Sequence, residues 1–417
     1  AWWTNAATAP DQLRQRVAFA LSEILVISDR SGTLQNYPRG VANYYDMLAK
    51  QSTGNFRTLL EDVTFNPMMG IWLTMVRSSK AQPDENYARE VMQLFSIGLE
   101  HLNKDGTYKR DANGNALPTY TQAEINELAR AFTGWTYAGS SSFTWTSSTD
   151  QINPLMSFEE QHDRGRKVFL GGATLSAGQT AKQDVRRSLD LIFAHPNVGP
   201  FVSKLLIKRL VTSNPSPAYV YRVASKFENN GKGVRGDIGA TVKAILLDPE
   251  ARNPVNTANG GKLSEPILRL TRLLRALPKP PGDNPPVLGR YLLRNVSAEF
   301  NQSPFQSPTV FNFYHPDYQP PGPLLAAGLS APEFEITTEL STVDTSNYLF
   351  DGVTSGFPTN SGPSIGIDYS SLQALWSTPD ALYARIEKLL LGRSMSAALR
   401  NSLETVRAAN TSSSGGV

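Results

Sequence analysis

The spacing of apolar residues limits this chain to a mainly helical fold. Leu13, Val17, Leu21 and Ile24 recur at intervals of three or four residues, which predicts an amphipathic helix over residues 10–28. The same pattern predicts further helices over residues 40–51, 54–64, 83–98, 121–134, 182–195, 197–212, 217–229, 235–248, 264–277, 331–350 and 378–392. We therefore expect the mainly α class, built as a large multi-helix domain.

Two stretches interrupt the predicted helices. Between residues 102 and 180, Asp-Gly and Asn-Gly turn dipeptides and a Ser-, Thr- and Gly-rich composition predict a small β-hairpin and an irregular insertion with short strands. Six prolines predict a loop over residues 304–323. We expect a mainly helical domain over residues 1–351, followed over 352–417 by a linker, a C-terminal helix and a disordered tail.

The charge balance bears on possible partners. The 417 residues include 40 Lys and Arg against 37 Asp and Glu, a formal net charge of +3. Contacts to a phosphate backbone need a concentrated basic excess, so this balance argues against a nucleic-acid partner. No apolar run approaches the roughly 18 residues that a membrane-spanning helix needs.

The chain has no cysteine and only four histidines. The lack of cysteine excludes disulfides, thiolate zinc sites, iron–sulfur clusters and cysteine nucleophiles. We predict no cofactor, and a bound divalent cation would have to use carboxylate and carbonyl oxygens. A first residue that is Ala1 rather than Met, together with the Ser-, Thr-, Asn-, Gly- and Pro-rich composition, leads us to expect a processed, exported protein that is secreted or periplasmic.

Common catalytic signatures are missing from the sequence. It contains no GxxxxGK[ST] phosphate loop, no GxGxxG after a predicted strand, no GxSxG nucleophile elbow and no HExxH zinc helix. A phosphate-loop NTPase, a Rossmann dehydrogenase, a standard α/β-hydrolase and a zincin are therefore disfavoured.

The segment at residues 83–90 is the first candidate site. Asp84 and Glu85 fall in the predicted first helical turn, where carboxylates favour the helix dipole. Glu85 and Arg89 have the i,i+4 spacing of an ordinary ion pair. The segment can be a buried network of caps and ion pairs. Alternatively, Asp84, Glu85 or Glu90 serves as a general acid or base or as a ligand of a hard cation.

The second candidate site is the segment His162-Asp163-x-Gly165-x-Lys167 in the irregular insertion. His162 could act as a base oriented by a carboxylate, with Lys167 facing the same pocket. The alternative is a surface turn that Asp163 holds by bonding its own backbone. Trp135, at a predicted helix end, is expected to plug the core; a sugar-stacking platform is the other interpretation.

Several segments together match a known sequence pattern. They read LRQRVAFAL at 13–21, PDENYARE at 83–90, YTQ at 120–122, ELARAFTGW at 127–135, HD with Gly165 and Lys167 at 162–167, NFY at 312–314 and PPG at 320–322. The chain thereby resembles the bacterial domain-of-unknown-function family numbered 1800, over about residues 10–350. The resemblance implies a mostly helical and largely exported protein, and it carries over no reaction.

Two functions remain open from the sequence. The first is a structural, assembly or interaction protein of the bacterial cell exterior, which associates with itself or with another exported protein. Charge is segregated as that role would require, because residues 264–294 hold six basic side chains and residues 295–384 hold nine acids without Lys or Arg.

The second function is an extracellular hydrolase that acts on a polymer. Its catalytic candidates are Asp84, Glu85, Glu90, His162 and Asp163, with Arg89, Lys167 and Trp135 in supporting roles. We prefer the interaction protein, because the sequence yields no complete catalytic constellation.

Overall fold

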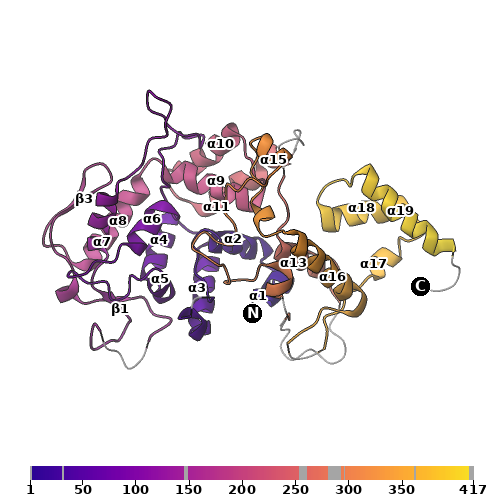
Figure 1. Ribbon diagram of the computed structural model, residues 1–417, viewed down its shortest axis with the longest axis horizontal. Helices are drawn as coiled ribbons and strands as arrows, with labels where there is room; N and C mark the ends of the chain where they lie inside the picture. Colours follow the sequence, from indigo (N-terminus) through magenta and orange to yellow (C-terminus); the bar gives the residue numbers. More distant parts are fainter. Residues whose placement is uncertain are drawn as a thin grey trace. The chain divides into compact units, whose positions relative to one another are not determined.

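The computed structural model describes residues 2–30, 32–144, 149–252, 261–279, 293–294, 296–360 and 363–412. These residues form helices joined by loops, with two small antiparallel sheets of two strands each (Figure 1). The mainly α class with small hairpin insertions is thereby confirmed. None of the helices in the described ranges combines the length and apolar character required to cross a bilayer.

The chain divides into two compact units. The large unit comprises Leu13–Leu263 and Ser303–Ile336, and the small unit comprises Ala1–Gln12, Ser264–Gln302 and Thr337–Val417. The boundary expected at residue 351 is not tested by this division and stays a prediction.

The large unit is a bundle of helices around one apolar core. Helices α9, α10 and α11 pack against one another (Figure 1), as do α6 with α7 and α4 with α8. Its helices are α2 (Gln12–Ser22), α3 (Pro38–Gln51), α4 (Phe56–Phe65), α5 (Pro67–Trp72), α6 (Asn86–Gln93), α7 (Gln122–Ala131), α8 (Ala181–Ala194), α9 (Val198–Leu210), α10 (Pro217–Glu228), α11 (Ile238–Leu247), α12 (Pro249–Arg252) and α15 (Pro323–Ala326).

Most of the apolar residues that the helical spacing singles out lie in the core, although Leu13 is 57% exposed. Val17 and Leu21 of α2 and Val91 of α6 are buried in one continuous cluster that extends to Ile245 of α11. Each fully buried aliphatic side chain of this kind stabilises the fold by roughly 1.5–3 kcal/mol. Local hydrogen bonds fix the helix starts: Thr121 accepts from the Glu124 backbone, and the Glu124 carboxylate bonds back. The spacing of Thr121 and Glu124 in the sequence predicts such a capping box, and the structure confirms it.

Short strands form within the predicted insertion. Strand β1 (Trp135–Thr136) pairs with β2 (Met156–Ser157), and β3 (Lys167–Phe169) pairs with β4 (Ala173–Leu175), both antiparallel. Isolated antiparallel β-bridges also form between residues 100 and 118. They pair Glu100 with Pro118, Leu102 with Tyr108 and Arg110 with Ala116. The expected small hairpins and irregular insertion are confirmed for the described part of residues 102–180.

The helix expected over residues 83–98 is shorter than predicted. Helix α6 begins at Asn86, because the Asp84 carboxylate accepts the Asn86 backbone N–H (2.9 Å) and the Asp84 N–H donates to the Ser78 hydroxyl (2.9 Å). Asp84 therefore precedes the helix instead of lying in its first turn. Likewise, α2 ends at Ser22 and not at residue 28.

The helix expected over 331–350 is displaced. Residues Pro332–Glu335 form a 3₁₀ turn, and α16 begins only at Glu339 and runs to Ser355. The spacing of Ser330 and Glu333 in the sequence also predicts a capping box, and this prediction is wrong. Asn214 bonds both backbone groups of Ser330, and Thr338 supplies the cap of α16.

The small unit is helical as well. It contains α1 (Trp2–Thr8), α13 (Pro266–Ala276), α14 (Val296–Phe300), α16 (Glu339–Ser355), α17 (Ser370–Gln373), α18 (Pro379–Ile386) and α19 (Ala397–Ser412). Helix α18 and a following π-helical turn end at Gly392, as predicted, with a positive φ of 69°.

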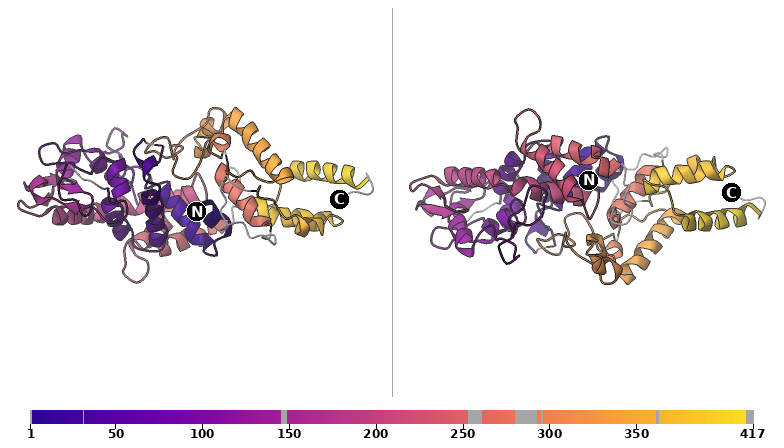
Figure 2. Two further views of the ribbon diagram at one scale, coloured as in Figure 1. Left: turned by 90° about the horizontal axis from the view of Figure 1, so that it is seen from below. Right: turned by 90° about the horizontal axis from the view of Figure 1, so that it is seen from above.

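Helix α19 was not predicted. It forms a hairpin with α18 at the yellow end of the chain (Figure 2), held by the Tyr383 hydroxyl and the Glu404 carboxylate. The disordered tail is expected from Asn410, but residues 410–412 are helical, and residues 413–417 lie outside the described residues.

Candidate functional site

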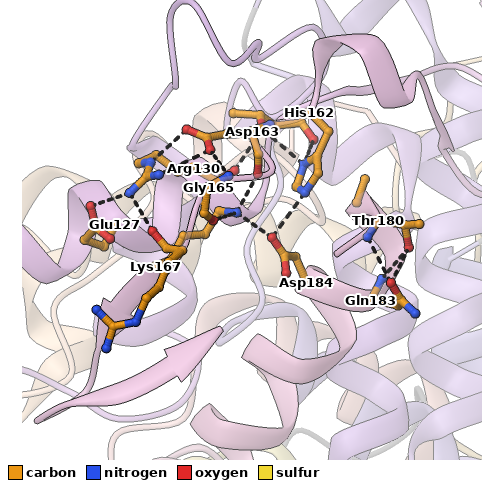
Figure 3. A network of polar contacts seen from close by, with 12 residues as sticks. Glu127, Arg130, His162, Asp163, Gly165, Lys167, Thr180, Gln183 and Asp184 are labelled. Carbon is orange, nitrogen blue, oxygen red and sulfur yellow. Dashed lines mark hydrogen bonds and ion pairs between the residues drawn. The ribbon is translucent and has the colours of Figure 1, made fainter. Parts of the chain in front are cut away.

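A buried polar cluster gathers side chains from α7, the loop after η2 (Glu159–Gln161), β3 and α8 (Figure 3). At its centre lie His162, Lys167 and Asp184, whose side chains have no exposed surface. Strand β3 directs Lys167 inward, and α8 brings Asp184 from the opposite side. Two of these three residues were predicted from the sequence, and Asp184 was not.

Lys167 is fully satisfied within the cluster. Its ammonium donates to the Asp184 carboxylate (2.5 Å) and to the backbone carbonyls of Asp163 (2.5 Å) and Gly165 (3.0 Å). An ammonium has three N–H donors, so none remains for a ligand. Lys167 therefore joins the loop to α8 and does not face a pocket.

His162 is held at both ring nitrogens. Nδ1 lies 3.0 Å from the carbonyl oxygen of Thr133, and Nε2 lies 3.1 Å from Asp184 Oδ2. The Thr133 hydroxyl donates to the Arg130 carbonyl (2.8 Å), so its hydrogen is already used. Both ring nitrogens thus contact groups inside the protein, and the ring has no exposed surface at which to take a proton from a substrate.

Asp163 pairs with Arg130 of α7. The two carboxylate oxygens accept from the guanidinium at 2.8 and 3.2 Å, and Oδ1 also accepts from the Gly165 N–H (2.7 Å). Burial would raise the pKa of Asp163, but the hydrogen bonds from Arg130 and Gly165 outweigh it and lower that pKa. Asp163 consequently stays ionised and holds a turn in its own backbone, which is the structural alternative expected for this segment.

The 83–90 segment forms a separate network. Glu85 and Arg89 are paired at 2.8 Å, and both bond the side chain of Gln122 at the start of α7. Glu90 is buried, and one of its oxygens has no hydrogen-bond partner among the described residues. Burial raises the pKa of Glu90, while nearby Arg89 opposes the shift.

Helix α7 separates Glu85 of the 83–90 segment from His162 of the second candidate site. Glu85 bonds Gln122 at its first residue, whereas His162 contacts Thr133 just beyond its last. At 1.5 Å per residue, these two points lie about 16 Å apart along the axis. The structure therefore does not bring Glu85 to His162. Their predicted catalytic roles are not otherwise tested.

A shallow depression lies above the buried cluster. It is lined by Lys80, Glu159, Glu160, His162, Asp163 and Arg164. Because the imidazole of His162 has no exposed surface, a molecule in the depression would meet only its backbone. The hydrolase hypothesis needs a histidine and a carboxylate that face the same solvent-filled site, and His162 does not face solvent here.

The large unit has a second depression that sequence reasoning missed. It has a volume of about 770 Å³ and lies among α3, α4, α8 and residues 152–157. Trp135 lines it, and that residue was the one sequence signal near it. Trp135 is only 3% exposed and lies 4.7 Å from the Phe65 ring, centroid to centroid, so the core-plug interpretation describes its packing.

No three His, Asp or Glu side chains among the described residues gather in an arrangement that could hold a metal ion. The loop at Asp111, whose spacing resembles the start of a calcium loop, is a turn in which Asp111 Oδ1 accepts from the N–H groups of Asn113 and Asn115 (both 2.8 Å).

Comparison with known proteins gives a family and no activity. A family model described as a protein of unknown function (DUF1800) matches residues 1–415, well beyond the segments that carried the resemblance. No curated protein and no solved structure matches the chain significantly. A function must therefore be argued from the geometry itself.

Proposed function

From the premise that the chain belongs to the DUF1800 family of proteins of unknown function, we propose that it is an interaction protein of the bacterial cell exterior that assembles with copies of itself. The observation that carries the proposal is an apolar stripe on α16 of the small unit. It consists of Leu340, Val343 and Phe350, which are 72%, 56% and 68% exposed.

The three stripe residues share one face of α16. Val343 follows Leu340 by three residues and Phe350 follows Val343 by seven, spacings that return to the same side of a helix. The opposite face buries Thr345 and Tyr348 in the small unit. Contiguous exposed apolar side chains of this kind mark protein–protein contacts.

Charge on the same unit indicates a second copy as the partner. Exposed acids flank the stripe at Glu339 and Asp351. Exposed basic residues follow on and after α13, at Arg272, Arg275 and Lys279. A second copy thus offers the complementary charge. Contact between two different surfaces of one protein is head-to-tail, the arrangement that builds rings or filaments.

The hydrolase alternative has less support. His162 and Asp163, its two loop residues, are engaged with Thr133, Asp184 and Arg130 inside the large unit. A general base needs a nitrogen or oxygen within reach of the substrate proton. The polar cluster is better explained as a structural link that holds the loop at residues 162–166 to β3 and α8.

The test is sedimentation of the full chain across a range of concentrations. We expect the weight-average mass to rise above 45.7 kDa with concentration. The triple variant Leu340→Ser, Val343→Ser, Phe350→Ser should stay monomeric. A matched control replaces three exposed leucines on three other helices with Ser: Leu13, Leu247 and Leu325. A wild-type chain that is monomeric throughout, or equal association of both variants, would contradict the proposal.

A further inference from the structure

Helix α19 of the small unit carries an apolar stripe that its own chain leaves uncovered. Leu399 and Val406 are 40% and 59% exposed, and Leu403 between them is half-buried. Their spacings of four and three residues place the three side chains on one face of the helix. No residue from 397 to 410 is buried. Because helices in proteins owe most of their stability to the packing of such a face, α19 calls for a partner.

A different face of α19 bonds the preceding helix. Polar side chains make these contacts: Arg400 with Asp380, Glu404 with Tyr383, and Arg407 with the Trp376 backbone carbonyl. The three α19 residues are themselves four and three positions apart, so they form a row of their own. At 3.6 residues per turn, that row lies about a quarter of a turn from the apolar stripe. The contacts with α18 therefore leave the stripe of α19 open.

Helices α16 and α19 have the same apolar periodicity. The three stripe residues of α16 take the first and fourth positions of two successive heptads, and Leu399, Leu403 and Val406 take the fourth, first and fourth. Side chains at these positions interlock when two helices pair along their length. The helices have 17 and 16 residues, so each is about 25 Å long at 1.5 Å per residue. The two stripes thus match in spacing and in length.

The charges of the two surfaces are opposite. Helix α16 contains three acids, Glu339, Asp344 and Asp351, and neither Lys nor Arg, a net charge of −3. Residues 379–412, which form α18 and α19, contain five basic and three acidic side chains, a net charge of +2. The basic residues of α13 adjoin this pair of helices, since Arg272 donates to the Leu390 carbonyl (2.9 Å). Opposite charge attracts the two surfaces and disfavours α16 against α16.

We propose that the α16 stripe of one copy packs against the α19 stripe of a second copy. The inference rests on the proposed function and names the surface that covers its stripe. Within one chain both stripes are exposed, so they do not cover each other there. The contact joins two different surfaces, and each copy keeps one of them for the next copy, which is head-to-tail association.

The experiment is sedimentation of two full-length variants, alone and mixed. One is the triple Ser variant of α16 described above, and the other is Leu399→Ser, Val406→Ser. We expect each variant alone to stay at 45.7 kDa at concentrations where the wild type associates. Each variant keeps the surface that the other has lost. Their equimolar mixture should therefore form a complex of one chain of each kind, with twice the mass of a single chain and no larger species.

The matched control is Leu247→Ser, Val234→Ser, which replaces one Leu and one Val at exposed positions of the large unit. It should associate as the wild type does. If the α19 variant also associates like the wild type while the α16 variant does not, only the inference about α19 fails. A mixture that stays monomeric overturns it too. A wild type that is monomeric at every concentration contradicts the proposed function itself.

The absence of cysteine from the chain allows a second, direct measurement. Val343→Cys chains are mixed with Leu399→Cys or Val406→Cys chains and oxidised, the two α19 positions covering antiparallel and parallel pairing. We expect a disulfide-linked dimer of one chain of each kind, and none with Val234→Cys as the control. Faster cross-linking of Val343→Cys chains to one another would show that the α16 stripe pairs with itself, which would overturn the proposal.

Discussion

At the scale of single residues, the large unit contains charged groups that are cut off from water and satisfied by one another. Asp184 Oδ2 accepts from both Lys167 and His162, whereas Asp184 Oδ1 has no partner among the described residues. The carboxylate therefore depends on these two side chains. A buried ion pair adds little net stability as a whole, but losing one partner leaves an uncompensated charge.

Replacing Lys167 with Met tests this dependence. The change keeps the length of the side chain and removes the ammonium, so Asp184 stays buried beside His162 alone. We expect the free energy of unfolding, measured in guanidinium chloride, to fall by about 3–5 kcal/mol. Arg164→Met is the control, because Arg164 is 52% exposed and its pair with Glu159 is worth at most about 1 kcal/mol. Equal effects of the two changes would show that the buried cluster does not hold the loop, β3 and α8 together.

At the scale of elements, side chains close in sequence decide where helices begin. Thr180 accepts from the Gln183 backbone and Gln183 bonds back, so the start of α8 is fixed within four residues. The start of α9 depends more on packing. Asn197 donates to the carbonyls of Ile97 (3.0 Å) and Glu100 (2.8 Å), which ties this helix to a loop a hundred residues earlier.

His195 makes this junction sensitive to pH. Its Nδ1 accepts the Asn197 N–H (3.2 Å), a bond that only the neutral form of this nitrogen can make. Burial lowers the pKa of His195 to about 4, and His101, Lys109 and Arg235 add to the shift. Since the unfolded chain binds the proton at its ordinary pKa of 6.5, stability is lost as the pH falls from 6.5 towards 4 and is unaffected above that window.

His195→Asn should remove this dependence. The Asn carboxamide oxygen can accept the Asn197 N–H but does not titrate in this range. We expect the variant to lose about 2 kcal/mol less stability than the wild type between pH 6.5 and pH 4, after allowance for partial solvent screening. Thermal unfolding at a series of pH values measures the difference. Parallel curves for the two proteins would rule out His195 as the source.

At the scale of the whole molecule, the two units are interleaved along the chain. The segment 303–336 returns to the large unit after the chain has entered the small unit. It brings Asn312 and Tyr314 to Glu23 (both 3.2 Å), and its Glu333 pairs with Lys262 (3.0 Å). The large unit is therefore completed by residues that are nearly 300 positions from its first helix.

A Gly/Ser replacement of residues 303–336, of equal length, tests that role. We expect the large unit to lose cooperative unfolding, a loss comparable with the whole stability of a domain, about 5–15 kcal/mol. Near-ultraviolet circular dichroism during heating measures it. Deletion of residues 397–417 is the control, since α19 belongs to the small unit. If both variants unfold at the wild-type temperature, segment 303–336 is dispensable.

The sequence alone determined the helical class, most helix positions, the capping box at Thr121 and the short hairpins. These features depend on hydrogen bonds and apolar spacings within a few residues, which the sequence displays directly. It misplaced the starts of α6 and α16. Asp84 caps Asn86 while Ser78 holds the Asp84 N–H, and Asn214, 116 residues from Ser330, bonds both backbone groups of that residue.

Only the tertiary structure decided which charges meet. His162 and Lys167 were singled out from the sequence, but their shared partner Asp184 lies 22 and 17 residues further on, with no local pattern to indicate it. The depression at Trp135 likewise takes its walls from three separate helices. Such pairings are set by how the apolar faces of the helices pack, and that depends on the whole chain at once.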